Sequence, residues 1–357
     1  MVENSFTTAL EEISALVETN NTKQYWMVRT DDGSNYDAFA DGGFVALNLR
    51  DYPTQFLFEI EQNHPNVNER FPYIKQALIE SYRNGLISLN CIEGDSAFNS
   101  NIGRLAKQIS ALAYSMKKGD IVLIPDRGAN RIKIGKVIDD GLVLDSNHNF
   151  SFSRNVEWLK EIYKSRLDPC LYKALGAHQA ICNITKYSEY IERNYNSYFT
   201  INNKFHYVLA VNAENVSAWK LSNMVYDILN CVKSISEEYD LGIDVENINF
   251  TINVNSPGKF SYVTSAKNAA MIMAVVAALS GGSITYNDFN VTTNGAFRTL
   301  VDCVNTWKDA QQERKQKAEI FDACMRSLDM QSVESSNDAY EVEEEYVDNQ
   351  EAETPEL

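Results

Sequence analysis

Two segments of the chain, residues 25–48 and 116–138, carry side chains that could recognise a planar, charged ligand. The first segment contains aromatic rings, and both carry polar residues at the ends of strand patterns, where charges are seldom needed for packing. A carboxylate there can accept from the exocyclic amine of a base, an amide can read a base edge, and a guanidinium can contact phosphate. The polar candidates for ligand binding are Asp126, Asn48, Arg29 and Arg127.

Four aromatic residues could form the walls of a pocket for a base. Stacking of a base on an aromatic ring contributes about 1–3 kcal/mol. Aromatic side chains also fill the core of a small β-barrel, and for Trp26 and Trp158 this alternative is preferred. The candidate wall residues are Trp26, Tyr36, Phe44 and Trp158.

The sequence pattern predicts that a meander of strands positions these residues. Gly119 ends a helix, and residues 120–125 alternate into a buried strand. A turn at 126–130 leads into a partner strand at 131–138, and a second turn follows at 139–141. These turns predict an antiparallel sheet that presents Asp126 and Arg127 at one end.

Five short pieces follow one another in a fixed order: Trp26-Met27-Val28-Arg29, Gly43-Phe44-Val45-Ala46, Lys118-Gly119-Asp120-Ile121-Val122, Ile134-Gly135-Lys136-Val137 and Arg154-Asn155-Val156-Glu157-Trp158. Together they resemble the N-terminal domain of Mrr-type restriction proteins, a relative of EVE and PUA-like barrels. The resemblance covers roughly residues 22–166. It implies a PUA-like β-barrel with helical insertions that reads a base, and a role in host defence against foreign DNA. One departure is Leu47-Asn48, where the family often has Gly-Trp, so one wall of the pocket is expected to differ. Arg154 is expected to be a surface ion-pair partner.

After residue 166 the pattern of expected helices and strands changes. Leu167-Asp168-Pro169 marks the expected boundary, because the residue before proline is biased away from helix. Helices then alternate with strands, which indicates a separate α/β or α+β domain. The expected fold class is therefore α+β, and the expected domains are an N-terminal helix over 1–21, the barrel over 22–166, the second domain over 167–333 and a disordered acidic tail over 334–357.

Hydrophobic periodicity predicts the remaining elements. The first helix, residues 5–17, is amphipathic and is expected to pack on the barrel or on a partner. The other expected helices are 68–85, 100–118, 170–180, 186–194, 216–239, 265–280 and 297–328, and the expected strands are 204–211, 248–254 and 283–289.

The charge of the chain is unevenly distributed. The formal net charge is −17, and the stretch after Val333 contains acidic residues but neither Lys nor Arg. This tail could engage a basic protein partner. The segment 117–136 is locally basic, which fits either contact with phosphates or a solvated edge that discourages strand aggregation. Its candidate nucleic-acid contacts are Lys117, Lys118, Arg131 and Lys133.

Several kinds of chemistry have no signature in the sequence. No restriction-type acidic pair with a following lysine, no phosphate-binding GxxxxGK[ST] and no HExxH is present, so no catalytic residue is assigned. The six cysteines are far apart, which predicts neither a metal site nor disulfides, and no cofactor is expected. Neither a secretion signal nor a run of about 20 apolar residues occurs, so a cytoplasmic protein without membrane contact is expected.

The leading hypothesis is a non-catalytic protein that recognises DNA or a free nucleotide, reading a modified base in a prokaryotic defence or regulatory system. The second domain would then form homo-oligomers or act as an effector. Two alternatives stay open. One is an interaction protein in which the barrel is a scaffold, and the other is an enzyme whose catalytic residues lie in the second domain without a recognisable motif.

Overall fold

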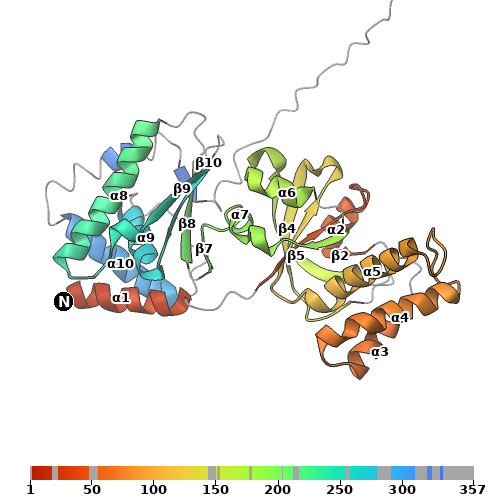
Figure 1. Ribbon diagram of the computed structural model, residues 1–357. Coiled ribbons are helices and arrows are strands. Elements are labelled where there is room, and N and C mark those ends of the chain that lie inside the picture. Colours follow the sequence, from red (N-terminus) through yellow and green to blue (C-terminus); the bar gives the residue numbers. More distant parts are fainter. Residues whose placement is uncertain are drawn as a thin grey trace, which may run out of the picture.

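The computed structural model describes residues 2–17, 23–47, 55–143, 150, 153–176, 179–202, 204–211, 217–253, 258–279, 291–309, 320–323 and 330–332. Two β-sheets, each with its own helices, lie side by side, and the short helix α7 (Ser188–Glu192) lies between them (Figure 1). Asn48, the expected strand 283–289 and the acidic tail are outside the described residues.

Six strands form the first sheet, in the order β2-β5-β4-β3-β1-β6. Neighbouring strands are antiparallel except β1 and β3, which run parallel. The register of β4 and β5 shifts between Ile134 and Gly135, and such a bulge bends the paired strands. The sheet curls into a half-barrel. Its combination with helices confirms the expected mixed α+β class. Its strands are β1 (Tyr25–Val28), β2 (Phe44–Ala46), β3 (Ile121–Pro125), β4 (Arg131–Val137), β5 (Ser153–Tyr163) and β6 (Ile181–Asn183).

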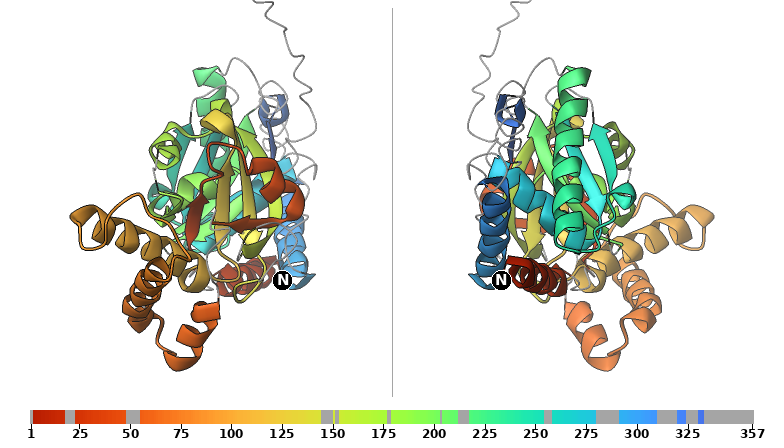
Figure 2. Two further views of the ribbon diagram at one scale, coloured as in Figure 1. Left: turned by 90° about the vertical axis from the view of Figure 1, so that its right-hand side faces the viewer. Right: turned by 90° about the vertical axis from the view of Figure 1, so that its left-hand side faces the viewer.

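Both faces of this sheet are covered, which explains why β1 and β3 are buried at every position. Trp26 and Val122 pack on one face with α2, α4 and α5, and Tyr25 and Ile121 pack on the other face with α6. Helices α3 and α4 and the outer part of α5 extend away from the sheet (Figures 1 and 2). The helices here are α2 (Tyr36–Gly42), α3 (Gln55–Asn63), α4 (Arg70–Arg83), α5 (Ser96–Ser110), the π-helical turn η2 (Ala111–Ser115), the single turns η3 (Arg127–Ala129), η4 (Lys164–Arg166) and η5 (Pro169–Leu171), and α6 (Tyr172–Leu175).

Asp120 joins the start of β3 to β1. Its buried carboxylate accepts from the backbone N–H of Gln24 (2.9 Å), from the indole Nε1 of Trp26 (2.8 Å) and from the backbone N–H of Lys117 (3.0 Å). Gly119 precedes it with φ +89°, a conformation that suits glycine. The Lys118-Gly119-Asp120 piece therefore has a structural role, because three donors, one of them the buried indole of Trp26, depend on one carboxylate.

Arg154 is buried, with 1% of its surface exposed, which corrects the expectation of a surface ion pair. Its Nε lies 2.6 Å from Asp139 Oδ1, and its Nη1 donates to the carbonyl oxygens of Leu112 (3.3 Å) and Met116. Nη2 donates to the Asp139 carbonyl over 2.9 Å. One guanidinium thus satisfies carbonyl groups at the end of the α5–η2 helix and connects them to β5.

The second sheet has the order β11-β8-β10-β9, with β7 also paired to β8. Among the described helices, α9 packs against one face of this sheet and α1, α8 and α10 pack on α9, which is buried along its whole length after Lys267. No helix among the described residues is long and apolar enough to cross a membrane. The elements are α1 (Val2–Val17), β7 (Tyr198–Ile201), β8 (Lys204–Val211), α8 (Ala218–Glu238), β9 (Asn249–Asn253), β10 (Gly258–Thr264), α9 (Ala266–Leu279), α10 (Val291–Asp309) and β11 (Met330–Ser332).

Two placements differ from the sequence expectations. Helix α1 packs on α9 and α10 in the core of the second sheet, with Phe6 and Leu10 fully buried there, and not on the half-barrel. Strand β6 pairs with β1 although it lies beyond the expected boundary at Leu167-Asp168-Pro169. The first sheet therefore continues past residue 166, because strand pairing joins residues that are far apart in sequence. The helix expected at 170–180 is confined to α6.

Candidate functional site

The parallel pairing of β1 and β3 brings two loops to one edge of the first sheet. Both strands end there, β1 at Val28 and β3 at Pro125, so the residues that follow them are neighbours. The hydroxyl of Thr30 donates to the carbonyl oxygen of Pro125 over 2.6 Å and holds the loops together. The carboxyl ends of parallel strands are frequent ligand sites in α/β proteins.

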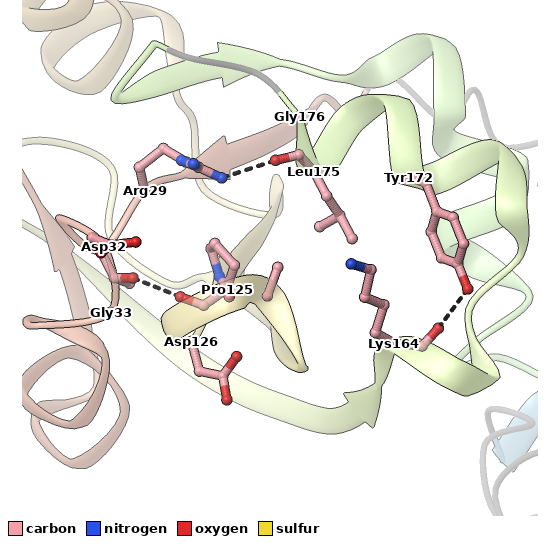
Figure 3. A pocket seen from close by; sticks show the side chains of 12 residues that line it. Arg29, Asp32, Gly33, Pro125, Asp126, Lys164, Tyr172, Leu175 and Gly176 are labelled. Atoms are coloured by element: carbon pink, nitrogen blue, oxygen red, sulfur yellow. Dashed lines mark hydrogen bonds between the residues drawn. The ribbon is translucent and has the colours of Figure 1, made fainter. Parts of the chain in front are cut away.

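A cavity of about 340 Å³ lies at this edge, and we call it the carboxyl-edge cavity. Arg29 and Asp32 come from the loop after β1, and Asp126 comes from the turn after β3 (Figure 3). Lys164 of η4 and Tyr172 of α6 line the side that faces them. Ligand pockets have volumes of about 300–1,000 Å³, so this cavity has the size for a small ligand.

Strained backbone forms the wall between the two loops. Asp31 and Asp32 have φ of 55° and 53°, and Gly33 has φ of 89°. A side chain on Gly33 would meet the backbone nitrogen of Arg127 at 2.5 Å, so only glycine permits this approach. Left-handed conformations at non-glycine residues cost free energy and cluster at functional sites. This local signature agrees with a binding role for the loop.

The two cationic side chains of the cavity are held differently. The Nη1 of Arg29 donates to the carbonyl oxygen of Leu175 over 2.8 Å, which fixes the guanidinium along one wall. The ammonium of Lys164 points into the cavity (Figure 3) and lies 5.7 Å from the centroid of the Tyr172 ring. Within the described part of the chain, neither Lys164 nor Asp32 has an ion pair with its side chain. Both are therefore available to a ligand.

Asp126 and Arg131, which the sequence assigned to different contacts, bind each other. The carboxylate of Asp126 accepts from the backbone N–H of Arg131 (2.9 Å) and from its Nε (3.1 Å). Arg131 also lies 3.8 Å from Glu161 and 5.3 Å from the centroid of the Tyr36 ring. Arg131 is thus neutralised by two carboxylates, and a phosphate would have to compete with them.

The expected aromatic walls lie elsewhere. Trp26 and Phe44 are buried in the core between the sheet and its helices, and neither lines the carboxyl-edge cavity. Tyr36 is also buried, and its hydroxyl donates to Glu161 over 2.7 Å. Burial and this hydrogen bond raise the pKa of Tyr36 above its ordinary value, so the phenol stays neutral. These rings stabilise the half-barrel because large apolar surfaces favour its interior.

Trp158 is half-buried on β5 and covers Gly135 of β4. A side chain on Gly135 would meet the Trp158 ring at 2.6 Å, so the indole lies directly on the backbone of the neighbouring strand. Its Nε1 donates to the carbonyl oxygen of Phe39 over 3.1 Å. This hydrogen bond connects β5 to α2, and Trp158 is absent from the cavity lining.

The basic residues predicted to contact phosphate do not form one patch with the cavity. Lys117 and Lys118 precede β3, whereas the cavity lies at its far end, about 16 Å away at 3.3 Å per residue. Lys118 lies 3.7 Å from Asp140, and Lys133 pairs across the strands with Glu161. Arg127 is exposed beside the cavity but does not line it. The basic residues of the β3–β4 hairpin are therefore distributed between the two ends of the sheet.

Sequence reasoning identified Arg29 and Asp126 but missed the other charged cavity residues. Asp32 was not among the predicted site residues, although consecutive acidic residues before glycine are compatible with left-handed backbone. Lys164 and Tyr172 carried no signal, because they reach the cavity only through pairing of β5 and packing of α6. Among the described residues, no group of three or more His, Cys, Asp or Glu could hold a metal ion.

Comparison with known proteins gives one match. A family model described as a domain of unknown function (DUF8426) matches residues 91–185. The matched range runs from before α5 to just after β6 and includes Asp126, Lys164 and Tyr172, but not the loop after β1. Neither the curated proteins nor the solved structures provide a significant match to the chain. The half-barrel and its cavity are therefore the basis for any functional assignment.

Proposed function

We propose that this chain is a non-catalytic recognition protein that binds a nucleotide, free or within DNA, and reads its base in the carboxyl-edge cavity. The resemblance to the N-terminal domain of Mrr-type restriction proteins supports a place in a prokaryotic defence or regulatory system that reads a modified base. The PUA-like character of the half-barrel belongs to the same proposal.

One observation carries the proposal: a cation and a carboxylate without ion-pair partners among the described residues, Lys164 and Asp32, line the same small cavity. A nucleotide has complementary groups, since its phosphate attracts an ammonium and the exocyclic amine of its base donates to a carboxylate. Tyr172 and Leu175 add apolar surface for the planar base. The strained loop fixes Asp32 before the ligand arrives, which lowers the entropy lost on binding.

Replacing Lys164 by glutamine is expected to weaken nucleotide binding about tenfold or more, because a charge-assisted hydrogen bond contributes about 1.5–3 kcal/mol. Binding is measured by native mass spectrometry and by calorimetry with free nucleotides and with unmodified and base-modified oligonucleotides. Asp32→Asn tests the carboxylate without altering the backbone, since asparagine also adopts positive φ. The affinity that Asp32→Asn loses should depend on which base the nucleotide carries and not on its number of phosphates.

Lys173→Gln is the matched control, because Lys173 is an exposed lysine on α6 that does not line the cavity. The control should bind as the unaltered chain does. Equal affinity in Lys164→Gln and Lys173→Gln, or the absence of any bound nucleotide, would remove the proposal.

A second candidate function is an oligomeric interaction protein. Trp219 and Tyr226 favour it, because they are 75% and 67% exposed and lie seven residues apart on one face of α8. If this face joins two copies, sedimentation velocity should give a dimer for the full chain and a monomer for Trp219→Ser. A monomer in both cases would exclude this interface.

A further inference from the structure

A layer of polar side chains lies between α7 and the second sheet. Phe260 and Tyr262 of β10 point into the helix-covered core, so Lys259 and Ser261 point to the opposite face. His206 of β8 pairs with Val263 and shares this face. Segment 188–197 covers this face, and α7 lies between the two sheets (Figure 1). Asn194 accepts from the ammonium of Lys259 over 2.8 Å, and Glu189 lies 3.9 Å from His206 Nδ1.

Helix α7 is attached to the first sheet by a buried carboxylate. Glu192 accepts from the hydroxyls of Tyr195 (2.7 Å) and Tyr25, and it lies 2.6 Å from the ammonium of Lys23. These contacts fix the residues that follow α7, Arg193 and Asn194, against the second sheet. The polar layer therefore connects the two sheets, because its residues make contacts with both of them.

Four residues of this layer, Arg193, His206, Lys259 and Ser261, form what we call the interlayer cluster. Arg193 Nε, His206 Nδ1 and Ser261 Oγ are buried and have no hydrogen-bond partner among the described residues. Arg193, His206 and Ser261 are 6%, 2% and 1% exposed. Lys259 donates to a neutral acceptor, the amide oxygen of Asn194, over 2.8 Å. Buried polar atoms are nearly always hydrogen-bonded, so three such atoms on one face indicate a missing partner.

The charges around the cluster indicate what that partner is. Lys160 of β5 and Arg166 of η4 add positive charge from the first sheet, and Lys204 adds it beside His206. Two carboxylates oppose them: Glu189 pairs with Arg193 and lies 3.9 Å from His206 Nδ1, and Asp168 lies near Lys259. The surroundings of the interlayer cluster therefore keep an excess of positive charge and of hydrogen-bond donors.

The titration of two cluster residues reflects this excess. Desolvation, followed by the charges of Lys160 and Arg166, lowers the pKa of Lys259 to about 7. Burial, followed by the charge of Arg193, lowers the pKa of His206 to about 4. A bound anion would favour the protonated form of Lys259 and accept from the donors.

We propose that the interlayer cluster is a second binding site, which takes a tetrahedral oxyanion such as inorganic phosphate or the phosphate group of a nucleotide. A phosphate has several acceptor oxygens in different directions, which suits donors that converge from β10, β8 and the end of α7. Lys259 is only half-buried and Arg166 is exposed, so the anion can reach the cluster from solvent. The site does not depend on the carboxyl-edge cavity.

Thermal unfolding of the full chain in inorganic phosphate tests the proposal. At ten times the Kd, phosphate should raise the Tm by about 3 °C relative to sodium chloride of equal ionic strength, and the rise should saturate. Lys259→Met should abolish the rise, and Ser261→Ala should reduce it. A nucleoside monophosphate that acts at lower concentration through Lys259 would assign the anion to a nucleotide; equal potency would assign it to free phosphate.

Lys220→Met is the matched control, because Lys220 is exposed on α8, which belongs to the helix-covered core on the opposite face of the sheet, and carries the same charge. It should keep the full response, and so should Lys164→Gln, which separates this site from the proposed nucleotide cavity. A rise in Tm that persists in Lys259→Met, or a rise no larger than that in chloride, would overturn the proposal. Water molecules would then be the partners of the buried donors.

Discussion

Replacing Arg154 by methionine is expected to lower the free energy of unfolding by about 3–5 kcal/mol, the range for breaking a buried ion pair. The variant leaves the carboxylate of Asp139 without its cation and removes the donors to the carbonyl oxygens of Leu112 and Met116. Arg154→Lys should lose less, because it keeps the charge but cannot reach all acceptors of the planar guanidinium. Urea denaturation followed by circular dichroism measures both changes.

The surface pair of Arg83 and Glu93 provides the control for this experiment. Its two nitrogens bind the carboxylate at 2.6 and 2.8 Å, but the side chains are 56% and 37% exposed. Arg83→Met should therefore cost much less than Arg154→Met, because solvent screens an exposed pair. If Arg154→Met costs no more than Arg83→Met, the assignment of Arg154 as the connection between β5 and the end of the α5–η2 helix is wrong.

Replacing Lys259 by methionine is expected to stabilise the chain by about 2 kcal/mol at pH 7 in the absence of phosphate. The Lys259 ammonium is desolvated, has the neutral amide of Asn194 as its acceptor and lies near other cations, so its charge is costly. Apolar replacement of buried charged groups often stabilises. The pKa of Lys259 falls from 10.5 to about 7 on folding. A shift of this size sets an upper limit near ~5 kcal/mol, and the partial exposure of the residue reduces it.

The sign of the pH dependence follows from proton binding. Between pH 10.5 and 7 the unfolded chain holds the Lys259 proton more strongly than the folded chain, so stability falls as the pH falls through this window. Below pH 7 both states are protonated and the loss is complete. Desolvation is the largest cause of the lowered pKa of Lys259; Lys160, Arg166 and Arg193 lower it further and Asp168 raises it.

The gain of Lys259→Met over the unaltered chain should therefore be largest at pH 7 and shrink toward pH 10.5. Guanidinium unfolding at four pH values from 7 to 10 measures it, with Lys220→Met as the exposed control that changes stability by less than about 0.5 kcal/mol. A pH-independent difference between the two variants would show that Lys259 does not titrate in this window.

The sequence by itself determined several elements of this protein, because their signal is local. Strand β8 matches the expected range 204–211, and α8 and α9 lie within the ranges 216–239 and 265–280. Periodicity of apolar side chains and flanking turn residues is sufficient for such elements. The hairpin of β3 and β4 was also predictable, since Asp126 to Asn130 form its turn.

Only the tertiary structure decided which side chains share a site. Arg154 was read as a surface residue because its acceptors, Leu112 and Met116, lie some forty residues earlier in the chain. Lys164 joins Arg29 only through the pairing of parallel β1 with β3 and the return of β5 along the sheet. Contacts of this kind leave no periodic trace in the sequence, because they depend on how distant elements pack and not on the residues beside them.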